Sequence, residues 1–589
     1  MKQWILLGCK GNFAEEAKEL NIDPVCVRIM GNRGMTTLKE MKEFLETDIS
    51  KCSSYDGLPD IDKAVKTIKD AKEKGLKCRV IGDYDADGVC SAAILVKGLS
   101  LFGLQTDYSI PNRLLDGYGL NINLVDKAYE DKIGIIVTCD NGISAREAID
   151  YASGLGIKTV VTDHHTVTLS ELPTKADAMV NPKLDDSTYP FSDICGAMVA
   201  YKLLNALFGD MKAFENVKEE LLELSAIATV TDVMPLKNEN RDAVKWILER
   251  LKNPKNMGLS KLVEGCNINQ KQGRCSSSDI GFQIGPCINA TGRIDVADRA
   301  VNLFVSDDEK ECGNIVGELI KLNVERKELT VECVGQAAHI LDKQVSDNVY
   351  PEACVVLYLP ECHASICGLV AGRIRERYYR PTFVFTDSKD GLTGSGRSID
   401  EFDMIKAVQE CSDLLTKFGG HKMACGLSIP KENLDAFRKK INAISGLDVQ
   451  NLFEKVRIDA NMPFGYVTPK VIEDISKLEP FGTGNPTPVF ALKNLRILNG
   501  RKFGEGRNHL LLNVSDNSGL TRTLKLWREA DAFDEFLIQN TSKDVTENFY
   551  SSEGIGDLNL RITVSYFPSI NEFNNRIGID FKMTDYKMS

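Results

Sequence analysis

The sequence predicts an α/β protein: a mostly parallel sheet, a second and smaller α/β unit joined to it by a long helix, and a C-terminal β-barrel. Apolar strands alternate with helical patterns from about residue 60 to 235, which is typical of βαβ units. Residues 297–345 keep a charged helical periodicity without proline, and short strands of alternating polarity follow residue 450. A chain of 589 residues is too long for one core, so we expect three or four domains.

The first large region should form a parallel sheet, because each apolar run is followed by a helical pattern before the next run begins. A parallel sheet needs such crossover segments between its strands. The predicted strands are Lys77–Gly82, Gln105–Ile110, Gly134–Cys139 and Thr159–Thr162, and helices are predicted from Ser91, Asn121 and Ser144.

The remaining segments are assigned in the same way. Residues 1–50 should form short helices with a loop, and the long helix should bend near Asp307-Asp308. The smaller unit opens with the strand Ala353–Tyr358, and the barrel contains His509–Val514 and Arg522–Trp527. The predicted domains are a helical segment (1–55), the parallel-sheet domain (56–296), a connecting helix (297–345), the smaller α/β domain (346–448) and the barrel (449–589).

The composition is that of an ordinary globular protein, with 43% hydrophobic and 26% charged residues. A net charge of −12 argues against a nucleic-acid partner for the chain as a whole, although active-site acids would contribute to it. Residues 493–528 reverse the balance, with eight Lys or Arg and two acids, and Arg373–Arg380 is basic with interleaved tyrosines. Each stretch is either a nucleic-acid site or a solvated face.

The 17 cysteines are scattered, without a C-x-x-C pair, so we expect buried reduced thiols rather than disulfides or a zinc site. The apolar stretch at the N-terminus is too short for a signal peptide, and no run of 18 apolar residues predicts a membrane span. A cytoplasmic protein without a membrane partner is the expectation.

Three apolar runs end in side chains that bind metals. Asp83, Asp85 and Asp87 follow the first run, Asp140 follows the second, and Asp163-His164-His165 follows the third. The carboxyl ends of strands in an open α/β sheet meet in one crevice. Six or seven oxygen and nitrogen ligands there suit a pair of Mn²⁺ or Mg²⁺ ions, and a metal pair suits phosphate-ester hydrolysis.

Plainer interpretations exist for the same residues. The three acids could form an Asp-rich turn that caps the following helix, but three neighbouring carboxylates repel one another unless a cation compensates. Adjacent histidines at a strand end could be structural, yet the chain has only six histidines.

These motifs resemble the DHH family of phosphoesterases, and in particular its RecJ-type single-strand-DNA exonucleases. The match begins with Asp83–Gly88, Asp140–Ile143 and Asp163–His165, and its fourth acid is Asp232. It runs in the family's order through nearly the whole chain. The further matching segments are Ile110–Arg113, Gly117–Leu120, Asn181-Pro182, Ile288–Arg293, Asn323–Arg326, Gly394–Ser398, Gly419–Gly426 and Leu478–Asn485.

The resemblance implies a parallel-sheet DHH domain, a DHH-associated domain and an OB-fold barrel. It implies that Asp140 bridges two divalent cations, Mn²⁺ or Mg²⁺, which would make Asp140 catalytic as well as a metal ligand. His165 would act on the scissile phosphate or orient a ligand, and His421 would lie beside the phosphate. One ion would be held by Asp87, His164 and Asp232, and the other by Asp85 with Asp83.

The resemblance also implies a substrate grip. Ser395, Gly396 and Arg397 would form a nest of backbone N–H groups and a guanidinium for a terminal 5′-phosphate. The plainer interpretation is a glycine-rich hairpin. Arg113, Arg293 and Arg326 would contact backbone phosphates, and Tyr118 would stack on a base or pack in the core.

In the barrel, Phe503, His509 and Trp527 would stack on bases or pack within the fold. Two positions depart from the family pattern. Cys287 stands where the family usually has arginine, which removes one phosphate contact and gives Arg293 more weight. His363 lies in a segment that differs from the family and is only a further candidate.

The resemblance therefore implies a 5′-to-3′ exonuclease that releases mononucleotides from single-stranded DNA, in repair and recombination. The resemblance adds a helicase and a single-strand-binding protein as candidate partners, and a monomeric chain. One rival is a phosphodiesterase for short oligoribonucleotides or cyclic dinucleotides, which would not need the roughly 140 C-terminal residues. Another is an inorganic pyrophosphatase, which would not need the barrel. A third is a non-catalytic DNA-binding scaffold, against which the intact acids and histidines argue.

Overall fold

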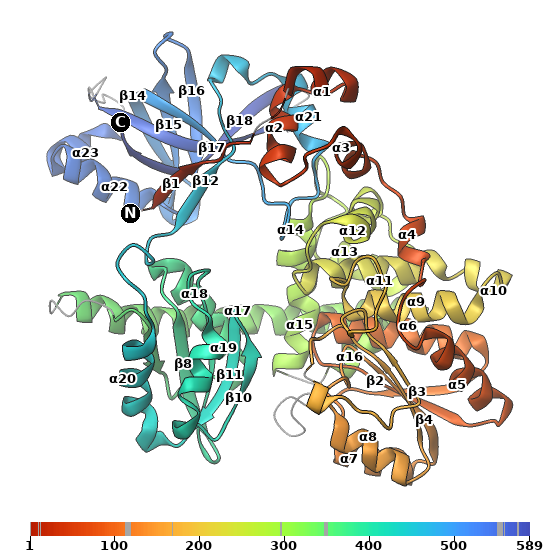
Figure 1. Ribbon diagram of the computed structural model, residues 1–589. Helices are drawn as coiled ribbons and strands as arrows, with labels where there is room; N and C mark the ends of the chain where they lie inside the picture. Colours follow the sequence, from red (N-terminus) through yellow and green to blue (C-terminus); the bar gives the residue numbers. More distant parts are fainter. Residues whose placement is uncertain are drawn as a thin grey trace.

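The chain folds into two α/β units joined by one long helix, with a barrel above them (Figure 1). The two units form the lower part of the view in Figure 1, and the barrel and the N-terminal helices form the upper part. The computed structural model describes residues 2–9, 11, 13–111, 119–167, 169–294, 297–346, 352–550, 558, 560–573 and 576–589.

The first unit contains a five-stranded parallel sheet in the order β3-β2-β4-β5-β6, which confirms the predicted parallel sheet. Its helix after β2 begins at Ala86 and not at Ser91, because the Asp85 carboxylate accepts the N–H groups of Asp87 and Gly88 and so starts the helix earlier. The elements are α5 (Ile61–Glu73), β2 (Lys77–Ile81), α6 (Ala86–Phe102), β3 (Gln105–Ser109), α7 (Ile122–Glu130), β4 (Ile133–Cys139), α8 (Arg146–Gly154), β5 (Lys158–Thr162) and β6 (Ala178–Val180).

A helical layer follows the sheet and packs on it. The apolar α9 and α11 lie against α6, so one core runs from the sheet into the helices. These helices are α9 (Gly196–Phe208), α10 (Lys212–Glu215), α11 (Lys218–Thr231), α12 (Asn238–Arg250), α13 (Met257–Gly265), α14 (Ser277–Asp279) and α15 (Gly285–Ile294), with a π-helical turn at Ile280–Ile284 before α15.

The predicted connecting helix consists of two helices. The short α16 (Asp298–Val305) ends at Ser306, and α17 (Glu309–Ser346) begins after Asp307-Asp308, where the sequence predicted a bend. The Asp308 side chain accepts the N–H of Glu311 and thereby caps the new helix. α17 then runs between the two units (Figure 1).

The second unit contains a mixed sheet in the order β10-β11-β9-β8-β7, with only the β7–β8 pair parallel. α18 packs on β8 and β9. The elements are β7 (Val355–Tyr358), α18 (Cys367–Tyr378), β8 (Thr382–Ser388), β9 (Gly391–Arg397), α19 (Met404–Glu410), β10 (Lys417–His421), β11 (Ala424–Ile429) and α20 (Leu434–Ile444).

The C-terminal region is a closed five-stranded barrel, as predicted. β14 pairs with both β15 and β17, and β16 pairs with β18, so the ring β14-β15-β16-β18-β17 has no open edge. The elements are β12 (Lys455–Ile458), β13 (Ala460–Asn461), α21 (Pro469–Ser476), β14 (Phe490–Phe503), β15 (His509–Ser515), β16 (Thr521–Leu526), α22 (Ala530–Asn540), α23 (Lys543–Phe549), β17 (Arg561–Phe573) and β18 (Arg576–Met588).

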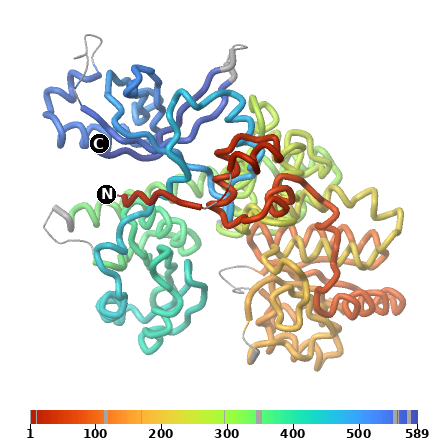
Figure 2. Tube along the Cα trace, turned by 45° about the horizontal axis from the view of Figure 1, so that its top comes forward, coloured from red at the N-terminus to blue at the C-terminus, as the bar shows by residue number. Residues whose placement is uncertain are grey.

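The N-terminal segment joins the barrel, which the sequence did not predict. The strand β1 (Gln3–Leu6) pairs in parallel with β12, and Trp4 donates a hydrogen bond to Asp585 near the other end of the chain. Both termini therefore lie at the barrel (Figure 2). The helices α1 (Phe13–Leu20), α2 (Pro24–Asn32) and α3 (Leu38–Leu45) share a core with the barrel, and α4 (Ser50–Ser53) leads into the first unit.

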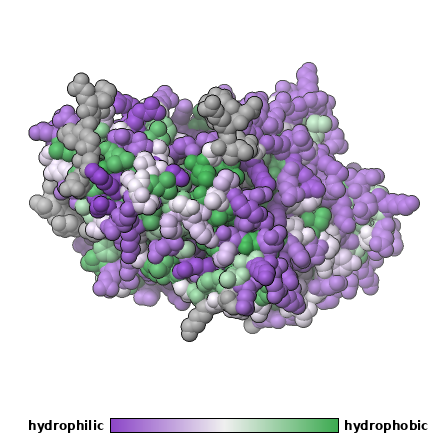
Figure 3. All heavy atoms as spheres, turned by 90° about the horizontal axis from the view of Figure 1, so that it is seen from above, coloured by the Kyte–Doolittle hydropathy of each residue, from purple (hydrophilic) through white to green (hydrophobic). Residues whose placement is uncertain are grey.

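The surface is of mixed polarity, and the cysteines are those of a chain without disulfides. The face in Figure 3 is hydrophilic over much of its area, with apolar residues gathered in its left and middle parts. Within the described ranges, no helix is long and apolar enough to cross a membrane. All 17 cysteines are free thiols; only Cys9 and Cys266 are partly exposed.

Candidate metal centre

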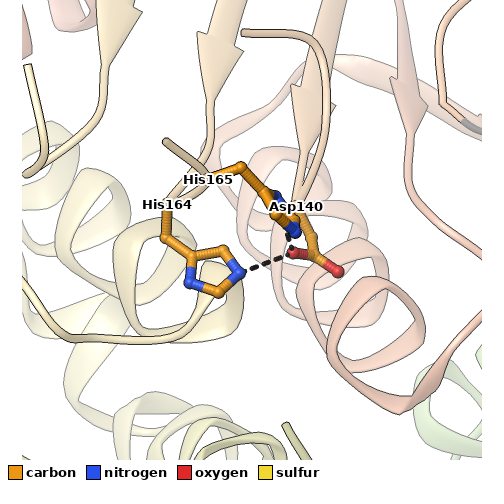
Figure 4. Close-up of side chains that lie close together, drawn as sticks. All are labelled: Asp140, His164 and His165. Atoms are coloured by element: carbon orange, nitrogen blue, oxygen red, sulfur yellow. Dashed lines mark ion pairs between the residues drawn. The ribbon is translucent and has the colours of Figure 1, made fainter. Parts of the chain in front are cut away.

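The predicted ligands meet at the carboxyl edge of the parallel sheet. Asp140 follows β4 and His164-His165 follow β5, and both imidazole rings point toward the Asp140 carboxylate (Figure 4). His164 Nε2 lies 3.1 Å from Asp140 Oδ1 and 3.6 Å from the nearest oxygens of Asp87 and Asp232. Carboxylates from three separate segments therefore converge on one imidazole.

The ligand atoms form three overlapping groups, each with all its atoms within 4.8 Å of one another. Asp140 belongs to two of the groups and His164 to two. The groups are Asp83 with Asp85 and Asp140, Asp87 with His164 and Asp232, and Asp140 with His164 and His165.

Backbone N–H groups hold two of the carboxylates of this centre, those of Asp85 and Asp87. Asp85 caps α6 through its side chain, so the capping interpretation and the metal interpretation describe the same turn. The two oxygens of Asp87 accept hydrogen bonds of 2.7 Å from the N–H groups of Gly196 and Ala197 at the start of α9. A helix N-terminus favours negative charge, so α9 helps to hold the Asp87 carboxylate.

Asp140 lies in a tight backbone position with φ of 59°, a left-handed conformation that non-glycine residues rarely adopt. Its neighbour Asn141 is fully buried and donates to the carbonyls of Ile81 and Cys139, which ties the ends of β2 and β4 together. A Cβ atom at Gly196 would lie 2.7 Å from that of Asp140, so α9 can approach the centre only with glycine there.

Asp163, which was named in the motif but given no role, holds both histidines. Its Oδ1 accepts the N–H groups of His164 and His165 and contacts His165 Nδ1 at 2.8 Å, and its Oδ2 accepts the N–H of Ile143. Asp163 is thus a positioning residue that orients the imidazole of His165.

The pKa values in this centre are strongly shifted. Burial and repulsion from Asp85 raise the pKa of Asp87 to about 7, although N–H groups oppose the shift. Burial and neighbouring carboxylates raise the pKa of Asp140 and of Asp232 well above the usual range. Placing these carboxylates together is costly, and a cation between them would remove that cost.

The two histidines shift in opposite directions. Burial and the nearby charge of His165 lower the pKa of His164 to about 3, so its imidazole is neutral and able to ligate a metal. Burial would also lower the pKa of His165, but the hydrogen bond and charge of Asp163, with further carboxylates, raise it to about 9. His165 therefore carries a positive charge near neutral pH.

The donor set fits divalent cations. Carboxylate oxygens and imidazole nitrogens suit Mn²⁺ and Mg²⁺, and no cysteine belongs to any of the three groups. The Asp232 Oδ2 atom is buried without a hydrogen-bond partner in the described structure, as a ligand atom awaiting a cation would be.

Two residues near the centre have roles that sequence reasoning missed. Asn181 is fully buried; its side chain donates to the carbonyl of His165 and accepts the N–H of Lys183. The charge of Lys183 contributes to lowering the pKa of both His164 and His421. An Asn-Pro pair after a short strand is too common a pattern to have revealed this.

The second unit faces the centre through His421 at the end of β10. Partial burial and the positive charges of His165 and Lys183 lower the pKa of His421. The first unit thus acts electrostatically on a residue more than 200 positions away in the sequence.

The predicted nest is wrong in its backbone part. Ser395, Gly396 and Arg397 lie within β9 and pair with β8 on one side and β11 on the other, so their backbone groups belong to the sheet. Ser395 and Arg397 share the half-buried face of the strand. A Cβ atom at Gly368 in α18 would lie 2.6 Å from the Arg397 guanidinium, so this glycine makes room for it.

Arg293 and Arg326 line one cavity of about 490 Å³ together with Val233, next to Asp232. Arg293 donates to the carbonyl of Ser365, and Ser365 in turn contacts His363 at 2.6 Å. Both predicted phosphate contacts therefore line a cavity that reaches the residue following Asp232. Arg113 and Tyr118 lie outside the described residues.

In the barrel, Phe503, His509 and Trp527 form one cluster with ring centroids 4.8 to 5.4 Å apart. Trp527 is 44% exposed, so packing and stacking on a ligand are both open to this ring.

Comparison with known proteins identifies all three regions. Family models match residues 77–229 (DHH family, N-terminal domain), 352–446 (DHHA1 domain) and 458–585 (RecJ OB domain). The chain is 32% identical to the single-stranded-DNA-specific exonuclease RecJ of Bacillus subtilis over 95% of this chain and 67% of that protein. It is 33% identical to the Escherichia coli enzyme over 88% of this chain and 91% of that protein.

The fold is also similar to a solved structure. The crystal structure of RecJ from Thermus thermophilus in complex with Mn²⁺ matches with a TM-score of 0.80 and 26% identity, covering 100% of this chain and 80% of that chain. The Mg²⁺ complex of the same protein matches with a TM-score of 0.73 and 26% identity, covering 100% and 78%.

Proposed function

Because this chain belongs to the RecJ family of DHH-domain proteins, we propose that it is an exonuclease specific for single-stranded DNA. It uses two divalent cations, Mn²⁺ or Mg²⁺, and releases mononucleotides from the 5′ end in repair and recombination. The observation that carries the proposal is the convergence of three ligand groups on Asp140 and His164. In this proposal residues 56–296 hold the hydrolytic centre, 346–448 grip the substrate end and 449–589 bind the strand.

Each cation has a set of side chains that would hold it. Asp87, His164 and Asp232 would hold one, Asp83 and Asp85 the other, and Asp140 would contact both. When bound, the cations lower the pKa of water and neutralise the scissile phosphate. The backbone N–H groups that donate to the side chains of Asp85 and Asp87 keep these carboxylates in place before substrate binds.

His165 supplies a positive charge on the substrate side of the centre. Its pKa of about 9 keeps it protonated, and Asp163 fixes its orientation. In this position it binds a non-bridging phosphate oxygen and stabilises the charge that develops during hydrolysis. His421 acts from the opposite side of the cleft.

The grip on the strand comes from side chains rather than from backbone amides. Ser395 and Arg397 bind the terminal 5′-phosphate, and Arg293 and Arg326 bind phosphates along the cavity. The closed barrel supplies further contacts to a long strand, which a dinucleotide hydrolase would not need. Seventeen free thiols are in keeping with a cytoplasmic enzyme, and a helicase and a single-strand-binding protein are the proposed partners of a monomer.

The direct test uses 5′-labelled and 3′-labelled single strands with Mn²⁺, beside blunt duplex DNA and a dinucleotide. Asp140→Asn is the inactive variant. Asp177→Asn is the matched control, because Asp177 accepts an N–H at the opposite end of β5, away from the metal centre. We expect early release of labelled mononucleotide from the 5′ label only, and a loss of at least about 1,000-fold in Asp140→Asn.

The other outcomes are equally clear. Cleavage of the dinucleotide alone would assign the chain to the short-oligonucleotide phosphodiesterases. Strand binding without any metal-dependent cleavage would support a non-catalytic scaffold. Early release from the 3′ label would reverse the proposed polarity.

A further inference from the structure

Two thiols lie in contact beside the substrate cavity. Cys266 caps the end of α13, and Cys287 lies in α15; their sulfur atoms are 3.9 Å apart. Cys287 is almost fully buried, whereas Cys266 is one of only two cysteines that are partly exposed. The pair is therefore close enough to react and open to solvent on one side.

The surroundings of Cys287 favour its thiolate. The Cys266 sulfur lies within hydrogen-bond distance of the Cys287 sulfur, and either thiol can donate. The side-chain amide of Asn323 donates to the Cys287 sulfur at 3.3 Å, and Lys327 and Arg326 add positive charge. Together these contacts lower the pKa of Cys287, although burial opposes the shift. A thiolate stabilised by donors and cations is the form that reacts with oxidants.

Cys287 is linked to the substrate cavity through one side chain. Asn323, which donates to Cys287, accepts hydrogen bonds from the Arg326 guanidinium at 2.9 and 3.3 Å. Arg326 lines the cavity that also contains Arg293. The orientation of Asn323 therefore couples the state of the sulfur to the position of a guanidinium that would bind phosphate.

We propose that Cys266 and Cys287 form a reversible disulfide on exposure to a peroxide, and that this disulfide weakens the hold of Arg326 on the DNA strand. The second part rests on the proposed function; the first does not. The oxidant must be small because Cys287 is almost fully buried, which favours a peroxide over a bulky disulfide.

The chemistry balances with the peroxide as oxidant. The Cys287 thiolate attacks one peroxide oxygen, the O–O bond breaks, and hydroxide leaves and is protonated to water. The Cys266 thiol then attacks the sulfenic sulfur; the S–O bond breaks and a second water leaves. Two thiols lose two electrons and two protons, and hydrogen peroxide is reduced to two molecules of water. Asn323 thereby loses its thiolate acceptor.

The chain contains a matched comparison. Cys362 and Cys367 lie 3.8 Å apart, but both are buried, whereas Cys266 is partly exposed. A hydrogen bond to the partner thiol and burial raise the pKa of Cys362 and of Cys266 alike. The pairs therefore differ in access and in the Asn323 donor on Cys287. Proximity alone would make this pair as reactive as Cys266 and Cys287. If thiolate stabilisation and access decide, only the 266–287 pair should respond at low peroxide.

The experiment treats the full chain with increasing hydrogen peroxide in chelator, followed by non-reducing peptide mapping and by measurement of single-strand affinity, also in chelator so that the strand is not cleaved. The variants are Cys266→Ser and Cys287→Ser, with Cys367→Ser as the control in the comparison pair. Cys266→Ser is the safer variant for folding because it leaves the buried Asn323–Cys287 contact in place.

We expect the linked 266–287 peptide to appear before any other cross-link, with a loss of about tenfold in strand affinity, the size of one misplaced charge-assisted contact. Dithiothreitol should restore the affinity. Cys266→Ser should keep its affinity under peroxide, and Cys367→Ser should respond as the wild type does.

Two results would overturn the proposal. One is the absence of the 266–287 link at a dose that already oxidises other thiols. The other is formation of the link without a change in strand affinity. If the untreated protein binds no single strand, the proposed function fails, and peptide mapping alone then decides whether the disulfide site exists.

Discussion

The candidate metal centre of the first unit and the strands β9 and β10 of the second unit, which carry the proposed substrate contacts, are built differently. Asp87, Asp140 and His164 are 1 to 3% exposed, and backbone groups from several elements hold the centre together. Ser395 and Arg397 are half-buried, and His421 is exposed. The side chains of the centre are held in place before any ligand binds, whereas the more exposed side chains of the second unit can change conformation. The difference suits a reaction whose chemistry repeats at every step while the bound strand changes.

The largest effect is expected from a variant that removes hydrogen bonds holding the metal centre in place but keeps every proposed metal ligand. Asp163→Asn leaves a side chain of the same size but cannot accept all the N–H groups that Asp163 accepts now. We expect kcat to fall by about 100-fold, the upper range for a partner that orients a ligand. Steady-state kinetics on a labelled single strand measures it.

The pH dependence of the same variant identifies the cause. Because Asp163 raises the pKa of His165 to about 9, the wild type should keep its activity up to about pH 8 and lose it above about pH 9. In Asp163→Asn this loss should begin at lower pH. An unchanged profile with a uniform fall in kcat would mean that Asp163 only supports the fold.

A smaller effect is expected in the second unit. Gly368→Ala adds a methyl group where the Arg397 guanidinium now lies, and the flexible end of that side chain can move away. We expect KM for a 5′-phosphorylated strand to rise by about tenfold, with kcat and Mn²⁺ affinity unchanged. Gly372→Ala in the same helix is the control, since its nearest contact is 4.0 Å away. Equal effects of both variants would contradict the assigned role of Arg397.

The third prediction concerns stability without metal. The pKa of Asp87 is raised to about 7 from an unfolded value of about 3.9, so the folded state binds the extra proton. This contribution to stability is complete below about pH 4 and is lost as pH rises through about 7. In chelator, Tm of the wild type relative to Asp87→Asn should fall by on the order of 5 °C between pH 5 and pH 8.

Calorimetry at several pH values measures this difference. Adding Mn²⁺ at pH 8 should raise Tm of the wild type and have less effect on Asp87→Asn. A wild type that gains stability relative to the variant over this pH range would show that the carboxylates do not repel one another as described.

The smallest expected effect is that of a charge in the first unit on a histidine in the second unit. Lys183→Met removes a positive charge that contributes to lowering the pKa of His421, so that pKa should rise. NMR titration of the histidine signals measures it. Lys175→Met is the control, because Lys175 pairs with Asp150 elsewhere in the first unit. An unchanged pKa of His421 in Lys183→Met would show that the charge of Lys183 does not reach His421.

The parallel sheet, the barrel and most of the candidate centre could be predicted from the amino-acid sequence. Acids and histidines follow apolar strands directly, so local pattern places them at one edge once the sheet is parallel. Asp232 was the exception: it follows the helix α11, and only the family resemblance pointed to it. The break before α17 was also visible, because Asp307-Asp308 interrupts the helical pattern.

The contacts between segments that are distant in the sequence could not be predicted and are seen only in the three-dimensional structure. Nothing local indicates that the N–H groups of Gly196 and Ala197 hold Asp87, that β1 pairs with β12, or that Cys266 meets Cys287. The nest failed for the same reason: the Gly-Ser-Gly-Arg pattern is typical of a loop, but pairing with strands on both sides makes it the middle of a sheet. Periodicity reports which face of an element is apolar, whereas the packing of those faces decides which residues meet.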